Sequence, residues 1–284
     1  MTREAIDGII LGALAEDAPW GDVTSEAFLP ESARASAALV PREPGILSGI
    51  EVFGRVFELV DEDVVVELGA EDGSAFEPGA VLARVEGSAR SVLRAERIAL
   101  NLSQRMSGIA TLTARYVAAV EGTRARIVDT RKTTPGLRIL ERQAVRDGGG
   151  HNHRYSLSDA VLAKDNHLAV LAAQGVSLGD AIRDARSRIG HTAHLEVEVD
   201  RLDQVEEVVA AGVDTIMLDN FSIDELVAGV ALVAGRVRVE ASGGVNLDTV
   251  AAIARTGVDV ISVGALTHSV RSLDLGLDVE VTAG

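Results

Sequence analysis

From about Ile109 onward, short apolar runs alternate with helix-like stretches, and this alternation limits the possible folds more than any other feature of the chain. Such an alternation is typical of βα units that build a parallel sheet. The recognisable runs are Arg126–Val128, Ala160–Ala163, Leu195–Val199, Thr215–Leu218, Val237–Val239 and Val258–Val263. A closed barrel of this kind has eight strands. Six runs therefore favour an open, incomplete α/β barrel.

The part of the chain before Ile109 has a different texture. Residues 3–15 carry apolar side chains at helical spacing, and a second helix pattern runs from Arg90 to Met106. Between them lie short alternating stretches bounded by turn residues, which predict strands at Ser36–Val40, Val64–Leu68 and Val81–Val85. We therefore expect a mixed α+β domain ahead of the barrel.

Polar or glycine residues follow the strand-like runs of the barrel region at their carboxyl ends. In α/β barrels these ends carry the active site, because the loops that follow the strands gather at one face. The groups are Asp129-Thr130-Arg131-Lys132, Lys164-Asp165-Asn166-His167, Glu196 with Glu198 and Asp200, Asp219-Asn220, Ser242-Gly243-Gly244, and Gly264. The sequence therefore predicts one site assembled from several strand ends.

The charge of the chain is strongly negative overall and locally inverted. The formal net charge is −16, which makes nucleic acid and anionic membranes poor partners. Residues 124–154 nevertheless contain eight Lys or Arg residues against three acids. Arginine forks pair bidentately with carboxylates and phosphates, so this segment suits a small polyanion. The only lysines, Lys132 and Lys164, both follow predicted strands, where we expect a compact ammonium to be required.

The acidic residues of the barrel region suggest a metal site. On Leu195–Val199 and the residue after it, Glu196, Glu198 and Asp200 project to one face and the valines to the other. Glu198 and Asp219 lie near the ends of successive strands, where they could hold Mg²⁺ directly or through water together with substrate phosphates. The alternative is that these acids pair with Lys132 or Lys164.

Two glycine turns predict a phosphate site. Ser242-Gly243-Gly244 and Gly264 follow the last two predicted strands and precede helix starts. Late barrel strands followed by such turns commonly bind phosphate through backbone N–H groups. Ordinary tight turns remain the alternative.

The composition limits other kinds of chemistry. The chain has no cysteine, which excludes disulfides, zinc–thiolate sites and thiol nucleophiles. It has no apolar run of 18 residues and no signal-peptide pattern at its start, so we expect a cytoplasmic protein without a membrane span.

Taken together, the strings resemble the quinolinate phosphoribosyltransferase family, in order, from about residue 14 to residue 270. Those that carry the resemblance are Glu16-Asp17, Gly21-Asp22-Val23-Thr24, Glu96-Arg97, Leu100-Asn101, Ser107-Gly108-Ile109-Ala110-Thr111, Asp129 to Arg138, Gly148-Gly149-Gly150, Asn152-His153-Arg154, Lys164 to His167, Glu196 to Val199, Leu218-Asp219-Asn220, Ser242-Gly243-Gly244 and Val263 to His268. The resemblance implies an enzyme, a pentosyltransferase that converts quinolinate and phosphoribosyl pyrophosphate into nicotinate mononucleotide, pyrophosphate and CO₂ in NAD biosynthesis.

The resemblance also implies an architecture. An N-terminal α/β sandwich domain, residues 1–108, would be joined by the C-terminal tail, 269–284. An open α/β barrel, residues 109–268, would carry both substrate sites. Members of the family are typically homodimers, in which the equivalent of Arg97 reaches into the partner's site.

The same resemblance assigns roles to residues. Arg131, His153, Arg154 and Lys164 would bind quinolinate, with Arg97 from the neighbouring chain. Lys132, Glu198 and Asp219 would act as catalytic groups on phosphoribosyl pyrophosphate and its Mg²⁺. The 5-phosphate would lie on Ser242, Gly243, Gly244 and Gly264.

The chain departs from the family pattern at Ser156, where glycine is usual, and at Ala163, where a larger aliphatic residue is usual; neither change removes a charged group. Three other functions stay open at this point. They are a related phosphoribosyltransferase with another acceptor, such as the similar protein associated with molybdate transport; a Schiff-base lyase that uses Lys164; and a non-catalytic sensor of a phosphorylated ligand.

Overall fold

A computed structural model describes residues 2–280 of the chain; Met1 and residues 281–284, the last four of the expected C-terminal tail, lie outside the described residues. Contacts divide the described chain into two compact units. The first comprises residues 2–114, 133–149 and 266–280, and the second comprises residues 115–132 and 150–265.

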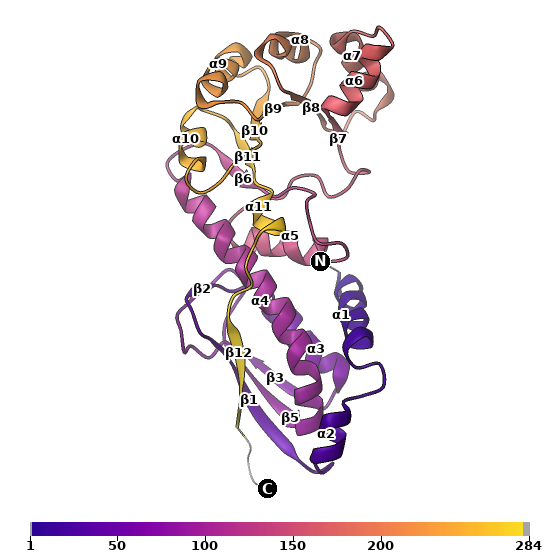
Figure 1. Ribbon diagram of the computed structural model, residues 1–284, viewed down its shortest axis with the longest axis vertical. Helices are drawn as coiled ribbons and strands as arrows, with labels where there is room; N and C mark the ends of the chain where they lie inside the picture. Colours follow the sequence, from indigo (N-terminus) through magenta and orange to yellow (C-terminus); the bar gives the residue numbers. More distant parts are fainter. Residues whose placement is uncertain (1, 281–284) are drawn as a thin grey trace. The chain divides into compact units, whose positions relative to one another are not determined.

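The first unit is built on an antiparallel sheet with strand order β12-β1-β5-β3 and a separate β2-β4 pair. Helix α3 packs against β3, and α1 packs against α3 (Figure 1). The elements are α1 (Arg3–Asp17), α2 (Val23–Phe28), β1 (Arg34–Pro41), β2 (Gly45–Ile46), α3 (Ile50–Val60), β3 (Val65–Leu68), β4 (Ala75–Phe76), β5 (Ala83–Ser88), α4 (Ala89–Ala119), α5 (Arg138–Asp147), α11 (Ala265–His268) and β12 (Leu275–Glu280).

The sequence explains the local structure of this unit. Strand β1 buries alternate residues, including Ala35, Ala37 and Leu39, as expected for a strand with one face on a core. Helix α3 buries Phe53 and Phe57, one turn apart, with ring centroids 5.0 Å from each other. The core of the unit therefore lies between the helices and the inner face of the sheet.

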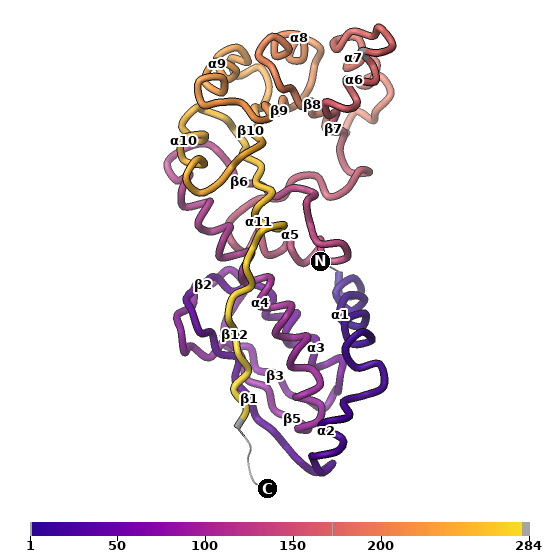
Figure 2. Tube along the Cα trace, viewed as in Figure 1, coloured from indigo at the N-terminus to yellow at the C-terminus, as the bar shows by residue number. Residues whose placement is uncertain are grey.

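The last described strand of the chain belongs to the first sheet. Figure 2 shows the yellow β12 running beside the indigo β1, and the two pair antiparallel, with Leu39 opposite Leu277. Both leucines are buried. The chain thus returns to its first unit after completing the second.

The second unit contains a six-stranded parallel sheet of order β6-β11-β10-β9-β8-β7, in which β6 and β7 form the two edges. Helices α8, α9 and α10 line the outer side of this sheet (Figure 1). The elements are β6 (Arg126–Val128), β7 (Val161–Ala163), α6 (Asp165–Ala173), α7 (Leu178–Arg188), β8 (Leu195–Val199), the 3₁₀ turn η1 (Leu202–Gln204), α8 (Val205–Ala210), β9 (Thr215–Asp219), α9 (Ile223–Val233), β10 (Arg238–Ser242), α10 (Val250–Arg255) and β11 (Val260–Ser262).

The expected fold class is confirmed: an N-terminal sheet domain is combined with an open, parallel α/β sheet. Each of the six apolar runs contains or overlaps one strand of the parallel sheet. Strands β8 and β9 are buried along almost their whole length, as expected for the inner strands of a parallel sheet.

Helix α4 runs further than the sequence pattern indicated. It extends to Ala119, through Gly108, where the pattern was expected to break and the first domain to end. A Cβ atom at Gly108 would lie 2.3 Å from the carbonyl oxygen of Arg271, so this glycine permits a close backbone approach rather than ending the helix.

Residues 133–149 pack with the first unit, although they fall within the expected barrel range 109–268. The Nε of Arg105 on α4 donates to the buried carboxylate of Glu141 at 2.8 Å, and the Ser48 hydroxyl donates to Asp147 at 2.6 Å. These contacts attach α5 to the first unit. The domain limits 1–108 and 109–268 stay a prediction.

Among residues 2–280, no helix combines the length and the apolar character that are needed to cross a lipid bilayer.

Candidate active site

A cavity of about 540 Å³ lies in the second unit at the carboxyl ends of the parallel strands. Its lining comes from the segments after β6, β7, β9 and β10 and from the last residues of β8 and β11. The lining residues are Thr130, Arg131, Lys132, His153, Arg154, Leu162, Lys164, Glu198, Met217, Asp219, Asn220, Glu240, Ser242, Gly243, Gly244 and Ser262.

Most of the predicted site residues meet in this cavity. Arg131, Lys132, His153, Arg154, Lys164, Glu198, Asp219, Ser242, Gly243 and Gly244 all line it. Two do not. Gly264 follows β11 without joining the lining, and Arg97 is an exposed residue of α4 in the first unit. The roles assigned to all twelve residues stay predictions.

Two cationic side chains of the cavity, Lys164 and Arg154, are held by contacts with oxygen atoms. The Nζ of Lys164 lies 3.1 Å from Oε2 of Glu198, so this lysine, one of the two that were possible partners, pairs with the acid. The guanidinium of Arg154 donates to the carbonyl oxygen of Ala160 at 3.0 Å. Burial lowers the pKa of Arg154, and the nearby charge of Arg131 lowers it further. Two guanidinium groups this close form a favourable site for a dicarboxylate.

A buried aspartate fixes the segment that carries His153. Asp129 follows β6, is fully buried, and accepts hydrogen bonds from the Asn152 side chain at 2.6 Å and from the His153 backbone N–H at 2.7 Å. His151 forms a parallel bridge with Val128 beside them. The chain from His151 to Arg154 therefore runs along β6 into the cavity.

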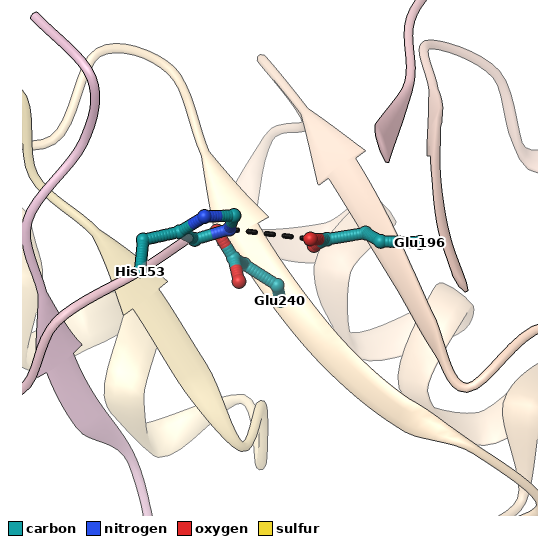
Figure 3. A group of neighbouring side chains, drawn as sticks. All are labelled: His153, Glu196 and Glu240. Atoms are coloured by element: carbon teal, nitrogen blue, oxygen red, sulfur yellow. Dashed lines mark ion pairs between the residues drawn. The ribbon is translucent and has the colours of Figure 1, made fainter. Parts of the chain in front are cut away.

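His153 reaches two buried carboxylates on the strands that flank β9. Its Nε2 lies 3.2 Å from Glu196 Oε2 on β8 and 3.5 Å from Glu240 Oε1 on β10 (Figure 3). The ligand atoms of these three residues all lie within 4.8 Å of one another, a spacing that could also hold a cation. Glu196 thus lies against the Nε2 of His153, so this buried acid has a hydrogen-bond donor.

The charges of this trio influence one another. Burial would lower the pKa of His153, but hydrogen bonds to Glu196 and Glu240 raise it to about 10. The Arg154 backbone N–H donates to Nδ1 at 2.8 Å, and only a ring without a proton on Nδ1 can accept it. Burial raises the pKa of Glu196, and Glu240 raises it further, whereas His153 lowers it. Nε2 therefore carries a proton in either state of the ring, and this proton faces the two glutamates.

The turn after β10 is shaped by a close approach. Gly243 has φ +87°, and a Cβ atom there would lie 2.1 Å from Oδ1 of Asn220. The N–H of Asn220 donates to the carbonyl oxygen of Ser242 at 2.9 Å, which joins the loops after β9 and β10. Only glycine allows this contact in this backbone conformation. The turn presents backbone groups at the cavity, as the phosphate prediction requires.

Sequence reasoning missed the parts played by Glu240 and Asp129. Glu240 alternates with Ser242 on β10, so its position two residues before a predicted phosphate turn was a usable signal. Asp129 was visible only as one acid of a strand-end string. Neither the burial of Asp129 nor its hydrogen bonds to residues 152 and 153 could be deduced from spacing.

Comparison with known proteins supplies the family. A model of the quinolinate phosphoribosyl transferase C-terminal domain matches residues 109–278, and one of the N-terminal domain matches residues 22–107. This chain belongs to the quinolinate phosphoribosyltransferase family.

Relatives in this family resemble the chain along nearly its whole length. A Mycobacterium leprae protein named nicotinate-nucleotide pyrophosphorylase [carboxylating] is 44% identical, over 97% of this chain and 98% of its own. A Bacillus subtilis protein named as a probable enzyme of the same kind is 42% identical, over 94% and 91%. The crystal structure of NadC from Streptococcus pyogenes is 41% identical with a TM-score of 0.94, covering 100% of this chain and 99% of its own. The resemblance inferred from the motifs is confirmed.

The two departures from the quinolinate phosphoribosyltransferase pattern have local surroundings. The Ser156 hydroxyl accepts a hydrogen bond from the Ser158 N–H at 3.1 Å within the loop that leads to β7. Ala163 is the last residue of β7, next to Lys164. Both lie between the two quinolinate-binding groups expected at His153 and Lys164.

Proposed function

We propose that this chain joins quinolinate to phosphoribosyl pyrophosphate and releases pyrophosphate and CO₂, with nicotinate mononucleotide as the product. The observation that carries the proposal is the lining of the 540 Å³ cavity. It places Arg131, Lys132, Arg154 and Lys164 around one space with Glu198 and Asp219, in a chain of net charge −16. Such a concentration of fixed positive groups suits two polyanionic substrates.

The reaction needs two substrates held in register. The pyridine nitrogen of quinolinate forms a bond to C1 of the ribose while the bond from C1 to the pyrophosphate oxygen breaks. The carboxylate next to the ring nitrogen then leaves as CO₂, its electron pair passes to the ring, and a proton replaces it. Arg131, Arg154 and Lys164 would hold the two carboxylates of quinolinate. Binding both substrates in one cavity supplies proximity and orientation, which can account for a large part of a rate enhancement.

Charge changes on the phosphoribosyl side would be met by Lys132, Glu198 and Asp219. Negative charge develops on the leaving pyrophosphate, and the compact ammonium of Lys132 would stabilise it. Positive charge develops at C1 of the ribose, and Glu198 on β8 would face it. The turn of Ser242, Gly243 and Gly244 would bind the 5-phosphate through backbone N–H groups, together with Gly264 from the turn after β11.

Glu198 and Asp219 form a donor set that fits Mg²⁺. Both are carboxylates at the carboxyl ends of adjacent strands, and both line the same cavity. Magnesium prefers oxygen ligands and is commonly held by one or two carboxylates together with phosphates and water. When bound, the ion would supply charge neutralisation for the pyrophosphate group. Glu198 and Asp219 would hold it directly or through water.

The proposal extends to assembly and location. We propose a homodimer in which Arg97 of each chain completes the quinolinate site of its partner. Arg97 is exposed on α4 and is not part of the lining of its own chain's cavity, which supports this arrangement. We also propose a cytoplasmic location, for which the absence of cysteine is consistent support.

The Schiff-base lyase is less well supported than the transferase. Lys164, its candidate nucleophile, is paired with Glu198 at 3.1 Å, and an ammonium held by a carboxylate lacks the free electron pair that attack on a carbonyl requires. Borohydride treatment in the presence of quinolinate should therefore trap no covalent adduct.

A product assay tests the proposal. The protein is incubated with quinolinate, phosphoribosyl pyrophosphate and Mg²⁺, and nicotinate mononucleotide, pyrophosphate and CO₂ are measured. We expect the three products in equal amounts, with none formed when nicotinate replaces quinolinate. Release of pyrophosphate without CO₂ would indicate a transferase with another acceptor. Binding of both compounds without any product would indicate a sensor.

A further inference from the structure

Two buried glutamates lie behind His153 and have no part in the proposed chemistry. Glu196 and Glu240 are each 3% exposed, and they come from strands on either side of β9. Figure 3 shows the His153 ring close to both carboxylates, with the ion pair to Glu196 drawn as a dashed line. Within the described residues, Oε1 of Glu196 has no hydrogen-bond partner, and Oε1 of Glu240 lies 3.5 Å from Nε2 of His153. Burying two carboxylates is costly, so their presence calls for a compensating cation.

His153 is engaged at both ring nitrogens. Nε2 faces the two glutamates at 3.2 and 3.5 Å, and Nδ1 accepts the Arg154 backbone N–H at 2.8 Å. A ring held in this way has no nitrogen left to bind the carboxylates of a ligand. The place of His153 at the cavity is therefore explained by the residue that it positions rather than by direct binding of the ligand.

The residue that His153 holds in place is Arg154. The backbone N–H of Arg154 is fixed by the ring, and its guanidinium is fixed at the other end by the Ala160 carbonyl oxygen at 3.0 Å. Arg131 lies near enough to lower the pKa of Arg154, whereas the charge of Glu196 acts in the opposite direction. Two like charges side by side need such opposing charge to stay in position before a substrate arrives.

We propose that Glu196 and Glu240 are positioning residues that act through His153 to hold Arg154 in place for the dicarboxylate of quinolinate. The inference rests on the proposed function, since it assigns Arg154 to quinolinate. It differs from the sequence-based expectation in giving His153 an indirect role. A metal ion on the three residues is the less favoured arrangement, because binding one would require Nε2 to lose the proton that faces Glu196 and Glu240.

The test measures steady-state kinetics for Glu196→Gln and Glu240→Gln, which keep the size of the side chain and remove its charge. We expect the KM for quinolinate to rise about tenfold in each, while the KM for phosphoribosyl pyrophosphate changes less than about twofold. The matched control is Asp214→Asn, which removes a carboxylate bonded to the Leu195 N–H at the opposite ends of β8 and β9. It should leave the quinolinate KM unchanged even if it lowers the melting temperature.

A double-mutant cycle separates positioning from simple destabilisation. In a His153→Asn background, Glu240→Gln should raise the quinolinate KM by less than about twofold more, because the link to Arg154 is already broken. Full additivity, an equal rise in both KM values, or tighter quinolinate binding would each overturn the proposal. So would one equivalent of a transition metal per purified chain that His153→Asn removes.

Failure of a variant to fold and failure of the proposed reaction are each detected separately. If neither glutamine variant folds, Glu240→Asp replaces them, since it keeps the charge and shortens the reach. A folded Glu240→Asp protein with wild-type quinolinate KM would contradict the proposal. The wild-type protein in the same assay tests the reaction itself, so failure of the proposed function would appear there, before any variant is compared.

Discussion

Lys164 and Glu198 form an ion pair, with Nζ 3.1 Å from Oε2, across neighbouring strands β7 and β8. One of the two is assigned to quinolinate and the other to phosphoribosyl pyrophosphate. The pair therefore lies where the two proposed subsites meet. Both substrates carry negative charge, so this contact has to rearrange or be shared when they bind.

The scarcity of lysine leads to the first prediction. Lys132→Arg should lower kcat/KM about 10²-fold or more, although it keeps the charge, because a planar guanidinium cannot replace a compact ammonium beside the leaving pyrophosphate. Steady-state kinetics check this. Arg255→Lys, an exchange at an exposed residue of α10, is the control and should have wild-type turnover. Near-normal activity of Lys132→Arg would contradict the inference that position 132 requires a compact ammonium.

The proposed dimer leads to the second prediction. Arg97→Ala and Lys164→Ala should each be nearly inactive alone. After mixing under conditions that exchange subunits, about a quarter of wild-type activity should return, because half of the dimers would be mixed and each would contain one intact site. Native mass spectrometry of differently tagged chains confirms the exchange. Mixed dimers that remain inactive would rule out a shared site.

Much of the fold could be predicted from the sequence because the signals are local. The run Leu195–Val199 matches strand β8 at both ends, since buried alternation of Leu and Val stops where Asp200 begins a solvated turn. The helix expected from Arg90 to Met106 is longer in the structure, and the glycine inside it, Gly108, is required by the backbone of Arg271, far away in the chain.

The sequence predicted which residues line the cavity better than it predicted the contacts between them. Strand ends placed Arg131, Lys132, Lys164, Glu198 and Asp219 correctly around one cavity. The link between His153 and Glu240 was not predictable, because it joins the segment beside β6 to β10, which are not neighbours in the sheet, and spacing alone does not give the strand order.

The turn after β10 gives the third prediction. Gly243→Ala should raise the KM for phosphoribosyl pyrophosphate about tenfold, because the new Cβ would displace Asn220 and distort the phosphate turn. Gly212→Ala, outside the cavity lining, is the matched control. Gly212 also has positive φ, +92°, but no atom lies within 4 Å of its added Cβ, so only backbone strain of about 1–2 kcal/mol is expected. Equal effects of the two substitutions on this KM would contradict the assigned contact.

The segment before β12 gives a prediction about pH. Arg271 donates to Glu43 at 2.8 Å, and the Asp274 N–H donates to the same carboxylate at 3.0 Å. The hydrogen bond from Arg271 lowers the pKa of Glu43 from 4.5 to about 2. A lowered pKa in the folded state contributes stability above the unfolded value, and this contribution is lost as the pH falls toward the folded value.

Glu43→Gln should therefore be less stable than the wild type at pH 7, and the difference should shrink as the pH falls from about 4.5 to about 2. Denaturant unfolding of both proteins at several pH values measures this. A stability difference that stays constant down to pH 2 would show that the Glu43 charge does not contribute.

The central claim is that one cavity of fixed positive groups holds both polyanions side by side. A crystal structure of the protein with quinolinate and a non-hydrolysable analogue of phosphoribosyl pyrophosphate tests it most directly. We predict the quinolinate carboxylates on Arg131, Arg154 and Lys164, and the 5-phosphate on the turn at Gly243 and Gly244. Both ligands bound elsewhere, with Arg131 and Arg154 turned toward solvent, would contradict the account.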